Sequence, residues 1–149
     1  MHMMLNKNLN SNYVVGLVDG EGSFTVYIRN PDKLFEVKRR VTVEPKFYLK
    51  LNEDDREILV KLKEFFGCGQ VYFQKDNRPN HKNCYRYEVF RKEDLLEIII
   101  PFFKKNPLQF PTKKKDFEIF CQLMEDIQDK KHLTTPGLHK MYLTKQKMH

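Results

Sequence analysis

An alternating pattern over residues 36–51 limits this chain to a fold that contains a sheet with two unlike faces. One parity of this stretch is mostly apolar, with Arg39 as an exception near its start. The other parity holds long polar and basic side chains: Lys38, Arg40, Thr42, Glu44, Lys46, Tyr48 and Lys50. Because successive side chains of a strand point to opposite faces, the pattern predicts a long strand with an apolar side and a cationic side.

Three further stretches show the period of a strand. Residues 23–30 alternate in the same way, and residues 69–75 and 84–91 follow a predicted helix. In the last stretch, the set of Tyr85, Tyr87 and Val89 and the set of Arg86, Glu88 and Phe90 are both candidates for the buried face. The side chains that we expect to point outward from the other two stretches are Ser23, Thr25, Tyr27, Arg29, Tyr72 and Gln74.

Helical spacing of apolar residues predicts the remaining elements. It indicates helices over residues 10–20, 52–66, 93–103, 112–129 and 135–147, the last packing Leu138 with Tyr142 or Leu143 inward. Pro45 cannot donate a ladder hydrogen bond, so an edge position or a bulge is expected there. We therefore expect an α+β fold over residues 1–149, as one domain. Its αββαββα core would form a saddle from a curved antiparallel sheet with one face under helices, and further helices would follow at the C-terminal end.

The charge of the chain indicates what the polar face binds. The 149 residues carry a net charge of +7 with a pI near 9.2, which favours a polyanionic partner. A strand over residues 36–51 would span roughly 50 Å, more than the ~34 Å of one turn of B-DNA. The sequence has no run of 18 apolar residues, so no membrane-spanning segment is expected.

Residues 10–24, N-S-N-Y-V-V-G-L-V-D-G-E-G-S-F, break several local rules of helix formation. Gly16 and Gly20 lie four residues apart and leave one bare helix face, although glycine in a helix costs about 0.8–1 kcal/mol relative to alanine. Small residues at this spacing allow another backbone to approach closely. Asp19 and Glu21 stand at the C-terminal end, where the helix dipole disfavours acids. Such local conflicts often mark functional sites.

The acids allow three interpretations. In the first, Glu21 and the backbone carbonyl of Gly20 bind Mg²⁺, which proteins commonly hold with one or two carboxylates plus phosphate oxygens. A single glutamate becomes adequate if a second copy meets it across the bare face. This interpretation predicts a symmetric dimer through the helix at about 11–20, with Tyr13, Gly16 and Gly20 at the interface.

The other two interpretations place the chemistry elsewhere or dispense with it. Asp32 after a proline, followed by Glu44-x-Lys46, matches a short pattern of restriction-type nucleases, although Asp32 is more simply a turn residue. Alternatively no acid is catalytic, and the protein only binds nucleic acid with its basic face. The run Lys113–Lys115 would then contact phosphates as well.

The stretch V-V-G-L-V-D-G-E-G-S-F resembles the motif of the LAGLIDADG homing endonucleases. Asp19 matches the first acid of that motif and Glu21 its catalytic acid, while valines replace Leu, Ala and Ile at positions 14, 15 and 18. The resemblance extends over L-K-E-F-F-G-C-G-Q-V at residues 62–71, residues 101–117, and D-K-K-H-L-T-T-P-G-L at residues 129–138, which are similar to fungal organellar members.

The resemblance implies a function and a site. Members with one motif are homodimers that cut both strands of a long, roughly palindromic DNA site by direct attack of metal-activated water, in the homing of a mobile intron. It implies Mg²⁺ at Glu21 and its dimer mate, with Ca²⁺ or Mn²⁺ able to replace it for binding, and no small-molecule cofactor. A lysine near the active centre corresponds to Lys113 or Lys114. Asp19 is expected to be structural.

The resemblance also leaves a second function open and suggests a location. The alternative is a non-cleaving nucleic-acid-binding protein such as an RNA-splicing maturase of the same family. The outward side chains of the sheet would read bases, in agreement with the alternation. The protein is expected to be located inside the cell, in a mitochondrion or a chloroplast if an organellar intron encodes the chain.

Overall fold

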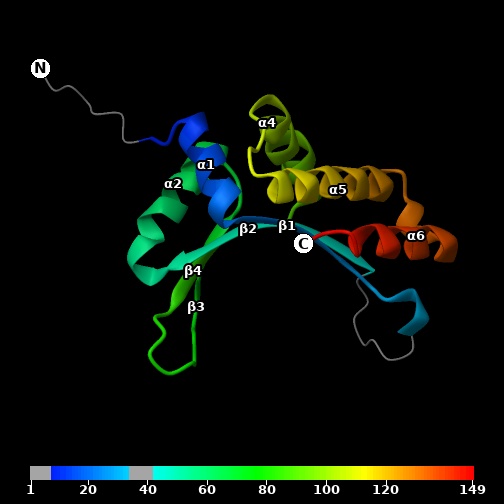
Figure 1. The fold of residues 1–149 in the computed structure, drawn as a ribbon, viewed down its shortest axis with the longest axis horizontal. Coiled ribbons are helices and arrows are strands. Elements are labelled where there is room, and N and C mark those ends of the chain that lie inside the picture. The colour runs from blue at the N-terminus through cyan, green and yellow to red at the C-terminus, as the bar shows by residue number, and fades with distance from the viewer. Residues whose placement is uncertain (1–7, 34–41) are drawn as a thin grey trace, which may run out of the picture.

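The computed structural model describes residues 8–33 and 42–149. Its helices and strands follow the expected order, with a four-stranded sheet and helices packed over one of its faces (Figure 1). The sequence-based prediction of an α+β fold is therefore confirmed. The first half of the predicted strand over 36–51, with Lys38 and Arg40, lies largely outside the described residues.

The sheet is antiparallel throughout and has the strand order β1-β2-β4-β3. Its strands are β1 (Gly22–Ile28), β2 (Val43–Asn52), β3 (Gln70–Gln74) and β4 (Cys84–Val89). β4 pairs with only the second half of β2, so Pro45 lies where β2 has a neighbour on one side alone. The register of β1 against β2 is continuous past Pro45, and the expected edge position is therefore met without a bulge.

The alternation of the strands separates the two faces as the sequence predicts. In β1 and in β2 from Val43 to Leu49, every second residue is buried, and Phe24 and Phe47 stack with ring centroids 5.0 Å apart. The face of β4 that the sequence left open is settled by Tyr87 and Val89, which are fully buried. Arg86 consequently lies on the outer face. Figure 1 shows the sheet as an arch, with α1, α4 and α5 above it and the outer face below.

The helices above the arch begin and end at recognisable signals. Asn10 caps α1 (Ser11–Glu21), and its side chain accepts a hydrogen bond from the Tyr13 N–H at 2.8 Å. The predicted helix over 52–66 is a short 3₁₀ turn, η2 (Glu53–Asp55), followed by α2 (Arg56–Phe66). Gly67 ends α2 with φ +72°, a left-handed conformation that glycine adopts without steric cost.

The C-terminal helices differ from the prediction in two respects. The segment predicted as one regular helix consists of α3 (Lys92–Asp94), a π-helical stretch η3 (Leu95–Ile99) and α4 (Ile100–Lys105). The Ile100 N–H donates to the Leu95 carbonyl, five residues back, directly before Pro101. Because proline lacks an N–H and crowds the preceding turn, a wider π turn at this point avoids the conflict.

The last two helices contribute the C-terminal residues of the core. They are α5 (Pro111–Gln128) and, after the 3₁₀ turn η4 (Lys131–Leu133), α6 (Thr135–Lys145). In α6 the buried side chains are Leu138 and Met141, whereas Leu143 is 54% exposed. Of the two residues that the sequence left open, Tyr142 is the inward one, because it is partly buried against the core. Met141, which the sequence analysis did not name, is buried as well.

Candidate functional site

The α1 helix has one packed side and one open side. Val14 and Val18 are fully buried against the core. A Cβ atom added to Gly16 or to Gly20 would meet nothing within 4 Å, and Tyr13 is 49% exposed. The side of α1 that carries the two glycines is thus an open surface of the chain, and below we call it the glycine face.

The two acids of the opening motif have opposite surroundings. Asp19 is only 5% exposed, whereas Glu21, the last residue of α1, is exposed. Just beyond them, the chain turns sharply into β1 at Gly22, where an added Cβ would lie 2.6 Å from the Val18 side chain. The turn therefore requires glycine at this position and leaves the Glu21 carboxylate at the surface.

The carboxylate of Asp19 binds the loop in front of α5. It accepts hydrogen bonds from the Gln109 N–H at 3.0 and 3.1 Å and from the Phe110 N–H at 3.1 Å. Phe110 is the residue that precedes α5, and its side chain caps nothing. Asp19 therefore joins α1 to the start of α5, in agreement with the structural role that the sequence suggested.

Lys113 joins the same two regions a second time. It stands in the first turn of α5, and its ammonium group donates a hydrogen bond to the Gly22 carbonyl, one residue after Glu21. Lys114 is exposed on α5, and its backbone N–H donates to the carbonyl of Phe110, the residue before that helix. Of the two lysines that the sequence could not separate, Lys113 is the one that reaches the junction of α1 and β1.

A polar cavity of about 430 Å³ adjoins Lys113 at the edge of the outer sheet face. Ser23, Thr25 and Tyr48 line it from the sheet, and Lys145 lines it from α6. The cavity thus connects the end of the motif helix with the side chains that point outward from the strands.

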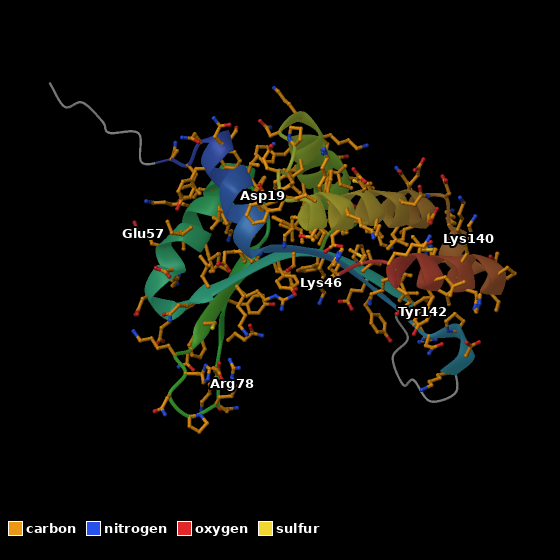
Figure 2. All side chains as sticks on the ribbon, in the orientation of Figure 1. Asp19, Lys46, Glu57, Arg78, Lys140 and Tyr142 are labelled. Carbon is orange, nitrogen blue, oxygen red and sulfur yellow. The ribbon has the colours of Figure 1, made fainter. Side chains whose placement is uncertain are left out.

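The outer face of the sheet holds the side chains that the alternation predicted to point outward. Cross-strand partners place Ser23 opposite Tyr48, Thr25 opposite Lys46, and Tyr27 opposite Glu44. Beyond this ladder the Arg29 N–H donates to the Thr42 carbonyl at 2.9 Å. The same face carries Lys50, Tyr72 and Gln74, whose strands are joined through β4. Figure 2 shows Lys46 on the underside of the arch, away from the helices.

Two residues at the centre of this face, Arg86 and Glu88, were not among the predicted binding residues. The Arg86 guanidinium lies 3.6 Å from the centre of the Tyr48 ring and donates to Glu88 at 3.1 Å. Glu88, only 8% exposed, also accepts from the Tyr72 hydroxyl at 3.1 Å and pairs with Lys46 at 3.6 Å. The face is therefore less purely cationic than predicted, since acids hold its cations in place.

Partial burial raises the pKa of the Tyr72 hydroxyl above its usual value of 10.0. The nearby Arg86 guanidinium opposes this shift, and the Glu88 carboxylate adds to it. The hydroxyl is protonated at neutral pH in any case and donates its hydrogen bond to Glu88. The signal that could have identified Arg86 and Glu88 was their parity with the basic row of β2, which requires the strand register to be read.

The restriction-type pattern finds less support in the fold. Asp32 is exposed in the 3₁₀ turn η1 (Pro31–Lys33), where its N–H bonds to the Asn30 side chain at 2.9 Å. Glu44 pairs instead with Lys46 at 3.5 Å on the outer face. Within residues 8–33 and 42–149, no three His, Cys, Asp or Glu side chains gather as a metal site. Asp32 thus has the surroundings of a turn residue.

The helices of the described residues are also informative about membranes. None of them combines the length and the apolar composition that a membrane crossing requires.

Comparisons with known proteins agree with this architecture. Residues 14–124 match the model of the LAGLIDADG endonuclease family. The chain is 33% identical over 111 residues to "Probable intron-encoded DNA endonuclease 1" of Mycosarcoma maydis, which covers 74% of this chain and 35% of that protein. It spans between 28% and 60% of the length of this and two further curated relatives.

Two of the solved proteins that share the fold illustrate the similarity. The homing endonuclease I-TnaI superposes with a TM-score of 0.78 at 32% identity, over 95% of this chain and 89% of that one. The LAGLIDADG homing endonuclease I-SmaMI, bound to cleaved DNA, superposes with a TM-score of 0.79 at 33% identity, over 95% of this chain and 44% of that one. I-SmaMI has also been solved with an uncleaved DNA target in the presence of calcium ions. The family match over residues 14–124 and a solved relative aligned over most of both chains together establish that this chain belongs to the LAGLIDADG endonuclease family.

Proposed function

We propose that this chain is a site-specific DNA endonuclease that makes a double-strand break in a long, roughly palindromic target, as in the homing of a mobile intron. The observation that carries the proposal is that the Lys113 ammonium bonds to the Gly22 carbonyl, one residue after the exposed Glu21, at the end of the glycine face. Relatives named as DNA endonucleases, one of them solved with cleaved DNA, support it.

The active unit is a homodimer. One chain offers a single exposed glutamate at the end of α1, which is a small donor set for a divalent cation. Packing of α1 against its symmetry mate through Tyr13, Gly16 and Gly20 would bring two such ends together on one axis. The open glycine face has the shape that this close helix contact needs.

The donor set suits a hard cation such as Mg²⁺. The Glu21 carboxylate and the Gly20 carbonyl would supply oxygen ligands, and the phosphate of bound DNA and water would supply the others. When bound, such an ion provides charge stabilisation and a reactive water at neutral pH. Ca²⁺ or Mn²⁺ would replace it for binding, and the chain needs no small-molecule cofactor.

The residues of the chain orient the reaction. Glu21 would hold the attacking water on one side of the scissile phosphate, in a direct displacement without a covalent intermediate. Lys113 already points its ammonium at the Gly22 carbonyl beside Glu21. From this position its positive charge would stabilise the negative charge that develops on the phosphate oxygens.

The outer face of the sheet would recognise the target. Lysine and arginine pair with guanine edges in the major groove, glutamine pairs with adenine, and glutamate accepts from cytosine. We assign this role to Thr25, Tyr27, Arg29, Thr42, Glu44, Lys46, Tyr48, Tyr72 and Gln74, to Arg86 and Glu88 beside them, and to Lys38 and Arg40 outside the described residues. Ser23 and Lys50 would contact the DNA from the same face without reading bases.

The competing function, an RNA-splicing maturase that does not cut, is not favoured, because the relatives are named endonucleases. Several relatives are also named as intron-encoded, which supports an intron as the origin of this chain. One lies in intron 1 of ND4 in Podospora anserina, and location in an organelle is proposed on that basis.

The decisive experiment is the Glu21→Gln variant on the target that the parent protein selects from randomised DNA. We expect it to bind this target in Mg²⁺ or Ca²⁺ with unchanged affinity and to cut about a thousandfold more slowly or not at all. The reason is that the bound cation contributes several kcal/mol to the transition state. Glu57→Gln, an exposed carboxylate on α2, is the control and should cut like the parent. Cleavage by Glu21→Gln at the parent's rate would place the site elsewhere, with Glu44 as the next candidate.

A further inference from the structure

We propose that Asp19 is a positioning residue for the proposed cleavage reaction, because it fixes the start of α5 and thereby holds Lys113 beside Glu21. The inference rests on the proposed function, and it gives the buried Asp19 a role different from that of the exposed Glu21. Asp19 is buried, and its carboxylate is directed at the loop before α5.

The first observation is how the Asp19 charge is satisfied. The carboxylate is 5% exposed, and the hydrogen bonds that it accepts come from the backbone N–H groups of Gln109 and Phe110. A buried carboxylate is costly unless it is hydrogen-bonded, and backbone N–H groups are effective partners for it. The two oxygens therefore fix the position of the loop directly before α5.

The second observation is what α5 lacks. Phe110 provides no side-chain cap, the first turn contains no acid, and three successive lysines follow from Lys113. Positive side chains at a helix N-terminus oppose its dipole. The Asp19 carboxylate, reached from a helix about 90 positions earlier, supplies the missing negative charge and the missing cap.

The third observation is that a second bond closes the same connection. The Lys113 ammonium donates to the Gly22 carbonyl, so the segment Asp19–Gly22 is held to the start of α5 at both of its ends. Glu21 lies between these two attachments. A displacement of about 1 Å at reacting groups can reduce a rate about a hundredfold, so this double connection determines whether Lys113 and Glu21 act together.

The test is the isosteric variant Asp19→Asn. Its amide keeps one acceptor oxygen but turns a donor toward a backbone N–H, and it removes the negative charge. We expect the rate constant of single-turnover cleavage, measured with protein in excess over the parent's target, to fall about tenfold to hundredfold. The dissociation constant for this DNA should stay within about twofold, since Asp19 lies away from the outer face.

The matched control is Asp126→Asn. Asp126 is also buried on α5, at 7% exposed, but it pairs with Gln122 and Lys131 near the other end of that helix. This variant should lower the melting temperature as Asp19→Asn does and should leave the cleavage rate constant unchanged. If Asp19→Asn lowers only the active fraction and the melting temperature, the positioning role is wrong.

A double-mutant cycle separates positioning from an independent effect. Lys113→Met should slow cleavage by itself, and adding Asp19→Asn to it should change the rate constant no further, because the lysine that Asp19 positions is already absent. An equal factor of slowing in both backgrounds would overturn the inference.

A spectroscopic measurement keeps the inference independent of activity. In NMR spectra, Asp19→Asn should shift the amide signals of Gln109 and Phe110 and the ammonium signal of Lys113, whereas Asp126→Asn should leave all three in place. A Lys113 signal unchanged by Asp19→Asn would contradict the inference. Failure of the parent to cut any DNA would instead refute the proposed function, and the NMR comparison would still decide whether Asp19 holds Lys113.

Discussion

The two faces of the sheet are built from the same strands, yet they follow different rules. On the inner face, Phe24, Phe47 and Tyr87 pack against helices of the same chain and are at most 4% exposed. On the outer face, Glu88 forms ion pairs with both Lys46 and Arg86. The inner face determines the fold, and the outer face can change without altering it.

The glycine face of α1 belongs with the outer face in this comparison. Both are surfaces that the chain leaves open, whereas the valine side of the same helix is closed by the core. This contrast between open and closed surfaces shows that, within one helix or strand, some side chains serve stability and their neighbours serve recognition. Substitutions on closed surfaces should therefore affect folding, and substitutions on open surfaces should affect association.

The largest effect is expected on the inner face. Phe47→Ala removes a fully buried ring that contacts the rings of Phe24, Phe66 and Phe103, and should lower the free energy of unfolding by about 3–5 kcal/mol. Urea denaturation followed by circular dichroism would measure this change. The neighbouring Tyr48→Ala should cost below about 1 kcal/mol, because Tyr48 lies on the outer face. Equal losses would remove the distinction between the faces.

The next effect is expected at the glycine face. Gly16→Leu should abolish dimerisation, which sedimentation velocity at micromolar concentration would detect. The same substitution should leave the single chain folded and stabilise it by up to about 1 kcal/mol, since leucine favours a helix more than glycine and has free space here.

Gly22→Leu is the matched variant for this test. It should destabilise the chain, because Val18 occupies the space into which the new side chain would extend. A parent protein that is a monomer both alone and with DNA would contradict the dimer.

The smallest effect is expected on the outer face. Arg86→Ala should reduce discrimination at one base pair of each half-site by about 1–3 kcal/mol, because a guanidinium oriented by Tyr48 and Glu88 is prepared for a guanine edge. Binding to a panel of single-base variants of the target would show it.

Lys50→Ala distinguishes base recognition from general attraction. Lys50 lies opposite Arg86 in the register, at an exposed position. Its loss should weaken binding to all sequences alike and reduce the salt dependence by about one phosphate contact. A uniform loss for Arg86→Ala as well would show that Arg86 contacts only the backbone of DNA.

The sequence predicts the strands well because burial of one face imposes a period of two, which can be read locally. It does not decide the buried face of β4, because aromatic residues occur in both parities there, at Tyr87 and at Phe90. Only pairing with β2 and β3 places Tyr87 inward. The π-helical stretch before Pro101 is also not predicted, because the spacing of apolar residues does not indicate how the backbone accommodates a proline inside a helix.

In the candidate site, too, some residues can be predicted from the local sequence and others depend on contacts between distant parts of the chain. Glu21 and the glycine face are visible in the sequence because they break local rules of the helix. The choice between Lys113 and Lys114 is not visible, because it depends on a contact with Gly22, which lies far away in the chain. The partners of Asp19 are hidden for the same reason, since a backbone N–H has no signature in the sequence.

Each contact between the motif and α5 joins one side chain to one main-chain group. The N–H groups of residues 109 and 110 donate to Asp19, and the carbonyl of residue 22 accepts from Lys113. Mutational drift can therefore change the side chains at 109 and 110 without weakening these contacts, as long as neither position becomes a proline, which has no N–H. Among the side chains at these contacts, only those of Asp19 and Lys113 have to keep their chemical identity, while the sharp turn keeps glycine at position 22. A descendant of this protein could accordingly alter the loop before α5 extensively and still inherit the same reactive geometry.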